Sequence, residues 1–207
     1  EVVLHAVDLD IRAASALVGG KIRRATVAFN ADAETATLHF SEALPAGAAR
    51  LSIEFNGVIL ERLRGFYRSV KDGARYAATQ FEAADARRAF PCFDEPEFKA
   101  RFALTLVVPP DVTALANGPQ REARTLPDGP QEIHFAETPP ISSYLVAYCV
   151  GPFAATPEAK TPSGVPVRVV LPRGMAGKGL YARDAHVRSL AYLEEYTGIA
   201  YPYTKVD

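Results

Sequence analysis

Apolar and polar residues alternate along most of this chain, and a period of two is the pattern of half-buried β-strands. In the first third of the sequence the alternation predicts strands at residues 7–12, 25–29, 35–40 and 50–55. Stretches rich in glycine, proline and asparagine separate these segments and predict turns. No apolar run with helical spacing interrupts them, so this part is expected to be antiparallel β structure.

The clearest alternation lies at residues 98–108, which we expect to form one long strand. Pro109 and Pro110 would end it, because proline cannot donate to the hydrogen-bond ladder. Further strands are expected at residues 112–116, 132–137, 144–150 and 166–171. The predicted fold class is therefore mostly β, an antiparallel, sandwich-like domain.

The pattern changes to helical spacing after Gly174. Apolar positions there predict a single helix at residues 178–197. Gly198 is well placed to cap the end of that helix, and Pro202 would prevent its continuation. One C-terminal α-helix is thus expected to follow the β domain.

Composition narrows the function classes. The net charge of −1 over 207 residues gives no basic surface of the kind that nucleic-acid binding requires. No apolar run approaches the roughly 18–20 residues of a transmembrane segment, and the first residues show no signal peptide. The cytoplasm is therefore favoured, while a secreted or periplasmic location stays open because the chain does not begin with methionine. Cys92 and Cys149 are expected to be buried free thiols, with a disulfide as the alternative.

Generic catalytic motifs are absent from the sequence. The four histidines belong to no H-E-x-x-H pair, and there is no C-x-x-C, no G-x-S-x-G and no phosphate-binding glycine loop. We therefore expect neither a catalytic residue nor a metal ligand within this chain.

Chemistry-bearing side chains concentrate in residues 79–102, TQFEAADARRAFPCFDEPEFKARF. Strand alternation would place Gln80 and Glu82 together on one face, with Phe81 on the other face in the core. An amide and a carboxylate would then point toward the same neighbour. The residues alone leave two interpretations open, a solvated polar face or a binding surface.

The same segment carries a dense run of charges. Asp85 is expected to cap the short turn that follows it. Arg87 and Arg88 are available to pair with Asp94 and Glu95. Exposed ion pairs contribute only about 0–1 kcal/mol each, so stability alone is a weak reason for so many charges in one loop.

Residues 79–102 resemble, almost residue for residue, the signature at the edge of the active site in the aminopeptidase N family of zinc metallopeptidases. Other segments are similar to that family in order and approximate spacing: residues 65–69 (GFYRS), 114–119 (ALANGP), 140–153 (PISSYLVAYCVGPF), 165–172 (VPVRVVLP) and 192–207 (YLEEYTGIAYPYTKVD). The resemblance implies a saddle-shaped N-terminal β domain over residues 1–174 and the start of a thermolysin-like catalytic domain over residues 175–207.

The resemblance also implies a division of roles. Zinc, its H-E-x-x-H ligands and the G-A-M-E-N motif would belong to the catalytic domain, and we expect them beyond Asp207. Glu82 matches the acidic residue that holds the free α-amino group of the substrate. Gln80 matches the glutamine that lines the pocket for the first side chain. The implied partners are peptides with a free N-terminus and the intramolecular catalytic domain.

Two alternatives remain at this point. The domain could be a non-catalytic, aminopeptidase-like scaffold for protein interaction, although a scaffold has no need for an ammonium anchor such as Glu82. It could instead be a free-standing β-sandwich binding module, which the terminal helix disfavours.

Overall fold

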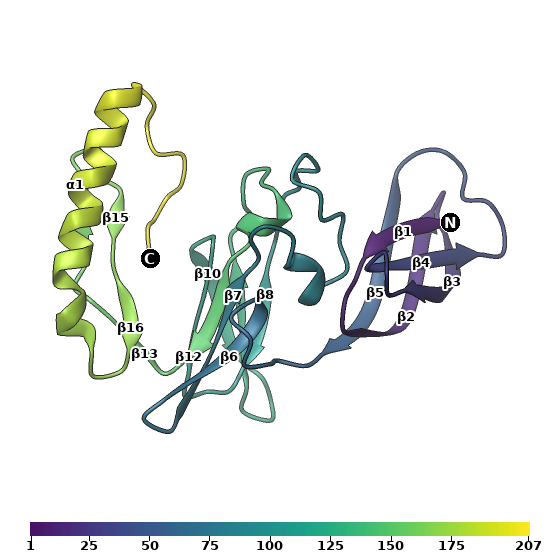
Figure 1. Cartoon of the computed structure of the whole chain (residues 1–207), viewed down its shortest axis with the longest axis horizontal. Coiled ribbons are helices and arrows are strands. Elements are labelled where there is room, and N and C mark those ends of the chain that lie inside the picture. The colour runs from purple at the N-terminus through teal and green to yellow at the C-terminus, as the bar shows by residue number, and fades with distance from the viewer. The chain divides into compact units, whose positions relative to one another are not determined.

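A computed structural model describes all of residues 1–207, in which strands dominate and one α-helix lies near the C-terminus (Figure 1). The chain forms two compact units, each built from three separate stretches. The first unit comprises Glu1–Arg68, Ala78–Arg101 and Pro139–Ala147. The second comprises Ser69–Ala77, Phe102–Thr138 and Tyr148–Asp207. The predicted fold class, mostly antiparallel β with one C-terminal helix, is confirmed.

The first unit contains a five-stranded antiparallel sheet in the order β1-β4-β3-β2-β5. Its strands are β1 (Val2–His5), β2 (Leu9–Val18), β3 (Lys21–Asn30), β4 (Thr35–Phe40) and β5 (Ala49–Gly57). All four strands expected in this region are present, and three of them are longer than the alternation suggested.

Buried side chains of this sheet form one apolar cluster: Leu4, Ala6, Leu9, Ile11, Ala14, Ala36 and Leu38. Along β2 the buried positions change phase, because the register between β2 and β5 shifts between Ile11 and Ala13. A bulge adds one residue to a strand and so moves the following side chains to the other face. The simple alternation therefore holds only as far as Ile11.

Two further sheets follow. The first has four strands in the order β6-β7-β12-β9, namely β6 (Gly65–Lys71), β7 (Ala74–Gln80), β12 (Tyr148–Gly151) and β9 (Thr113–Ala116). The second has three strands in the order β10-β11-β8, namely β10 (Gln120–Thr125), β11 (Gln131–Phe135) and β8 (Thr105–Val108). The second unit has its own apolar cluster, made of Val108, Ala114, Ala116, Ile133 and Phe135.

The long strand expected at residues 98–108 is shorter in the structure, where only Thr105–Val108 is a regular strand. Backbone hydrogen bonds before it join Ala100 to Ile141, Phe102 to Thr138 and Leu104 to Phe135. From one hydrogen bond to the next, residues 100–104 advance by two positions while the partner segment 135–141 moves by three. This mismatch prevents a regular β-ladder. Pro139 and Pro140 lie in that partner segment and have no N–H to donate.

The rest of the second unit consists of short strands and the helix. Two-stranded pairs join β13 (Phe153–Ala155) to β16 (Val170–Pro172) and β14 (Ala159–Lys160) to β15 (Pro166–Val167). Three 3₁₀ turns complete the chain: η1 (Ala86–Arg88), η2 (Ser143–Leu145) and η3 (Ala176–Gly179). The strand expected at residues 144–150 is η2 and β12, and the one at 166–171 is β15 and β16.

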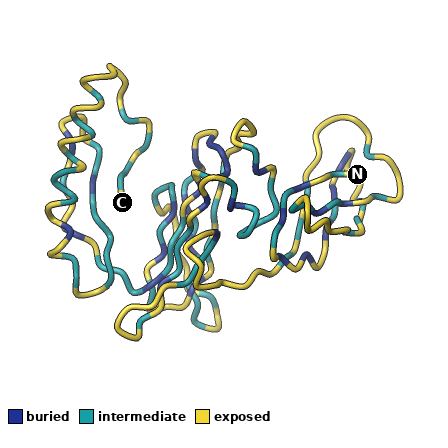
Figure 2. Tube along the Cα trace, viewed as in Figure 1, coloured by how far each residue is buried: buried dark blue, intermediate teal, exposed yellow.

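Helix α1 (Leu180–Thr197) lies beside β14 and β15 (Figure 1). It ends as predicted, since Gly198 adopts a left-handed conformation and its N–H donates to the carbonyl of Glu194 at 3.0 Å. None of its residues is buried (Figure 2). No helix of the structure has the length and apolar character needed to cross a membrane.

Candidate functional site

The two residues that the sequence singles out lie at the end of β7, in the first unit. Gln80 is the last residue of that strand, and Glu82 begins the turn that follows it. The predicted alternation is thus wrong beyond Gln80, because the strand ends before Glu82. Both side chains are nevertheless exposed, and the Glu82 carboxylate has no ion-pair partner in the structure.

The turn that carries Glu82 is fixed at its two ends. Phe81 is only 1% exposed and meets the ring of Phe90 edge-on, with the ring centroids 5.9 Å apart. Its position in the core is as predicted. The N–H of Asp85 donates to the carbonyl of Phe81 at 2.9 Å and closes the turn. The peptide bond that follows Glu82 is cis.

The carboxylate of Asp85 does not cap η1, contrary to the prediction. It accepts hydrogen bonds from two arginine side chains instead, those of Arg64 in the segment before β6 and of Arg88 in η1. Arg64 Nη2 lies 2.7 Å and Arg88 Nε 2.9 Å from the same carboxylate oxygen, Oδ1. A carboxylate held by two guanidinium groups gains more from these charge-assisted bonds than from one backbone N–H.

Burial and ion pairing act in opposite directions on Asp85. Burial tends to raise the pKa of its carboxyl group, but the hydrogen bonds from Arg64 and Arg88 outweigh burial and lower that pKa. The hydrogen bond to Asp85 also raises the pKa of the Arg64 guanidinium. Asp85 and Arg64 therefore stay charged at neutral pH.

A second set of ion pairs continues from η1. Arg87 Nε lies 2.9 Å from Asp94, as the sequence suggested, and Arg87 Nη1 lies 2.8 Å from Glu34. Burial tends to lower the pKa of Arg87, but its bonds to Asp94 and Glu34 raise it overall. Arg87 binds Oδ2 of Asp94, and the hydroxyl of Ser143 donates to Oδ1 of the same carboxylate at 2.5 Å.

Arg88 differs from the prediction, since it does not reach Glu95. Its guanidinium binds Glu34 at 3.2 Å and Asp8 at 3.3 Å in addition to Asp85. Glu95 lies 3.7 Å from the ring nitrogen of His5 instead. We refer to the ion-paired side chains of Asp8, Glu34, Arg64, Asp85, Arg87, Arg88 and Asp94 as the charge cluster.

Gly65 allows β6 to approach η1. Its φ of +69° lies in the left-handed region, which favours glycine. A Cβ at this position would also lie 3.0 Å from the Cβ of Arg88. Residues 65–69 could be singled out from the sequence but Arg64 could not, because nothing in a single sequence connects it with a carboxylate 21 positions away.

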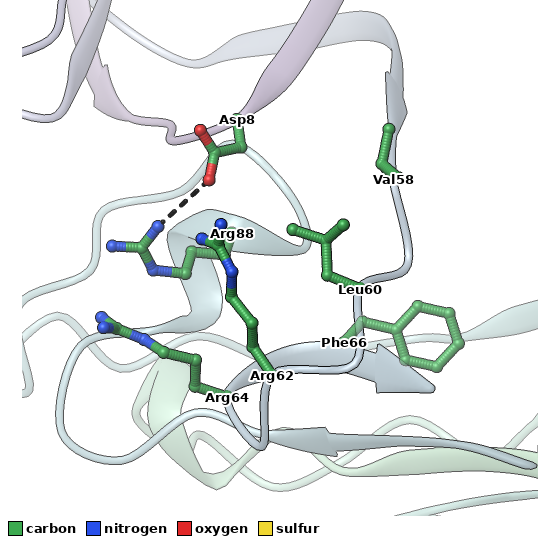
Figure 3. Close-up of a pocket in the computed structure, with 7 residues that line it drawn as sticks. All are labelled: Asp8, Val58, Leu60, Arg62, Arg64, Phe66 and Arg88. Atoms are coloured by element: carbon green, nitrogen blue, oxygen red, sulfur yellow. Dashed lines mark hydrogen bonds and ion pairs between the residues drawn. The ribbon is translucent and has the colours of Figure 1, made fainter. Parts of the chain in front are cut away.

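A small cavity opens beside the charge cluster (Figure 3). Its lining residues are Asp8, Val58, Leu60, Arg62, Arg64, Phe66 and Arg88. Figure 3 shows the side chain of Arg88 extending to Asp8, while the ring of Phe66 points away from the three arginines. The cavity measures about 30 Å³, room for one or two water molecules and not for an amino-acid side chain.

The side chains of this chain do not fit a metal site. No group of three or more His, Cys, Asp or Glu side chains is arranged to hold a metal ion. Both cysteines are free thiols, as predicted, but each is half-buried where the sequence led us to expect a buried side chain. What the site offers chemically is one unpaired carboxylate, Glu82, and the exposed amide of Gln80 two positions before it in the sequence.

Comparison with known proteins gives a consistent picture. Residues 1–145 match the peptidase M1 N-terminal domain. The chain is 41% identical to aminopeptidase M1-C of Oryza sativa subsp. japonica and 40% identical to aminopeptidase M1 of Arabidopsis thaliana. These matches cover 99% and 100% of this chain but 24% of each relative. Aminopeptidase N of Acetobacter pasteurianus is 36% identical over 89% of this chain and 53% of that protein. The chain thus spans about a quarter of the length of the plant relatives.

Proposed function

Because the chain belongs to the peptidase M1 family and contains its N-terminal domain, we propose that it recognises the N-terminus of peptides in a zinc-dependent aminopeptidase. In this proposal Glu82 binds the free α-amino group of the substrate, and Gln80 lines part of the pocket for the first side chain. Zinc and its ligands belong to a catalytic domain whose main part lies outside these residues, and residues 175–207 are its first segment.

The observation that supports the proposal best is the state of the Glu82 carboxylate. It is exposed and has no ion-pair partner, although seven charged side chains pair with one another within the same unit. A carboxylate and an ammonium about 4 Å apart attract each other by several kcal/mol at an effective dielectric constant near 20. An unpaired carboxylate at the end of a strand is thus suited to bind the ammonium group of a peptide.

Such an anchor would also determine where the peptide is cut. An ammonium group bound at a fixed distance from the reacting centre selects peptides with a free N-terminus and brings one peptide bond into position. The product would then be a single N-terminal residue. Gln80, two positions before the anchor, would contact the side chain of that residue.

The test is Glu82→Gln in the full-length protein that carries this chain. Hydrogen bonds to charged groups contribute about 1.5–3 kcal/mol, so we expect KM for an aminoacyl anilide to rise about 10- to 100-fold. Zinc content, measured by atomic absorption, should stay normal, because Glu82 is not proposed as a ligand. Glu54→Gln, at an exposed glutamate of β5 in the same unit, is the matched control.

Unchanged kinetics in Glu82→Gln would remove Glu82 from the site. Loss of zinc from the same variant would also contradict the proposal, since the residue would then act on the metal centre.

A further inference from the structure

The charge cluster includes Asp85, the residue that ends the turn carrying Glu82, and its arrangement points to a role for Asp85. Three residues, Glu82 to Ala84, separate the buried ring of Phe81 from the ion-paired carboxylate of Asp85. Both ends of the turn are thus held by side-chain contacts, and the Asp85 N–H closes it onto the Phe81 carbonyl. The freedom of Glu82 depends on those two ends.

The structure assigns to Asp85 the role of a positioning residue, which fixes the turn Phe81–Asp85 and thereby the place of the Glu82 carboxylate. This inference rests on the proposed function of Glu82 and deepens it. Asp85 does not itself contact the substrate. It acts through the backbone of the turn, which Arg64 and Arg88 hold from outside the turn.

The geometry at Asp85 supports a positioning role more than a purely stabilising one. Arg64 approaches through both Nε and Nη2, so its planar guanidinium fixes direction as well as distance. Arg88 binds the same carboxylate through Nε and keeps its other two nitrogens for Asp8 and Glu34. Arg88 is thus bound by three carboxylates at once, and Arg64 adds a second guanidinium to the carboxylate of Asp85.

The partners of Arg88 are held in uncommon backbone conformations. Asp8 and Glu34 have φ values of +56° and +55°, in the left-handed region that non-glycine residues seldom adopt. Such conformations cost free energy and persist where the surrounding contacts impose them. Both residues whose backbones adopt this conformation bind Arg88 through their carboxylates. We infer that the position of Arg88, and with it that of Asp85, is closely defined.

The test is a double-mutant cycle between Asp85→Asn and Glu82→Gln in the full-length protein. Asparagine keeps the shape of the side chain but removes the charge that Arg64 and Arg88 bind. We expect Asp85→Asn alone to lower kcat/KM for a free-amine aminoacyl anilide about 10-fold. In the Glu82→Gln background the same change should lower it less than twofold, because the group that Asp85 positions is already absent.

Ser143→Ala is the matched control, because it removes the buried hydrogen bond to Asp94 at the other end of the charge cluster. It should lower the midpoint of thermal unfolding and leave kcat/KM within twofold. If Asp85→Asn does not fold, Arg64→Gln replaces it. The Arg64 side chain is 53% exposed, and its loss leaves Arg88 bound to Asp85. We expect Arg64→Gln to lower kcat/KM about three- to tenfold, again only when Glu82 is present.

The outcomes separate the two levels of the inference. If Glu82→Gln changes nothing, the proposed function fails, and the positioning role fails with it. If Glu82→Gln lowers kcat/KM but Asp85→Asn does not, only the positioning role fails. An equal loss on Asp85→Asn with and without Glu82 would also overturn it, since Asp85 would then act independently of the anchor.

Discussion

The two cysteines show how burial and nearby charges together set the reactivity of a side chain. Burial raises the pKa of the Cys92 thiol to about 12, and the nearby charge of Asp94 adds to the effect. Burial likewise raises the pKa of the Cys149 thiol to about 11, with Lys205 opposing it. Only the thiolate is nucleophilic, so neither cysteine is expected to react readily near neutral pH.

We predict slow modification of both thiols in the folded chain. At pH 8 an ordinary cysteine with a pKa of about 8.5 is roughly one-quarter thiolate, whereas a pKa of about 11 or 12 leaves about one thiol in 1,000 or 10,000 ionised. Because both values are raised, the thiolate fraction grows about tenfold for each pH unit between 8 and 10.

Iodoacetamide labelling followed by mass spectrometry measures this difference. The folded chain should react at least about 100-fold more slowly at pH 8 than the same chain in urea, and its rate should rise with pH. Equal rates in the two states would show that the thiols are not shielded.

At the scale of the elements, the sequence predicted the regular parts of the fold and missed those that depend on distant partners. Strand β4 and the end of α1 have local signals, an alternating pattern and a glycine at the C-cap. The segment at residues 98–104 has an alternating pattern too, but its partner strand contains Pro139 and Pro140 and cannot complete the ladder. A pattern along one strand says nothing about its partner.

The candidate site divides in the same way. The burial of Phe81 could be predicted from the strand pattern, but the shared strand face of Gln80 and Glu82 could not, because β7 ends at Gln80. The pair of Arg87 with Asp94 was also predicted, since the two residues are only seven positions apart. The pairs of Asp85 with Arg64 and of Arg88 with Asp8 span 21 and 80 residues, and only the folded chain brings these groups together.

The C-cap of α1 provides a test at this scale. Gly198 has a φ of +67°, and nothing lies within 4 Å of the place where a Cβ would stand. Gly198→Ala therefore adds no clash and penalises only the left-handed backbone, by about 1–2 kcal/mol. We expect a lower midpoint of thermal unfolding, measured by circular dichroism at 222 nm.

Gly177→Ala is the matched control for this prediction. Its Cβ would also meet nothing within 4 Å, and Gly177 has no positive φ. Its midpoint should stay close to that of the parent chain. If both variants lost the same stability, the left-handed cap would not be the cause.

At the scale of the whole molecule, the exposed side of α1 is informative. The helix has no buried residue, and five large apolar side chains on it are exposed: Leu180, Tyr181, Tyr192, Leu193 and Tyr196. Single exposed apolar residues are ordinary, but a helix without a buried residue gains little stability from packing against its own unit. This agrees with the proposal that α1 opens a catalytic domain whose remainder packs elsewhere on it.

The proposed division of labour predicts that the 207-residue chain by itself hydrolyses no aminoacyl anilide, with or without added zinc. Its side chains offer no cluster of three metal-binding groups, and the role proposed for Glu82 is to bind an ammonium group and not to activate water. Release of the chromophore by the purified chain, measured by absorbance, should equal that of the Glu82→Gln chain and of buffer. The full-length protein assayed in parallel should be active and should lose that activity on treatment with a zinc chelator. Suppose instead that the 207-residue chain showed zinc-dependent turnover and that Glu82→Gln reduced it. The chain would then carry out catalysis as well as substrate recognition, and the proposed division between the two domains would be wrong.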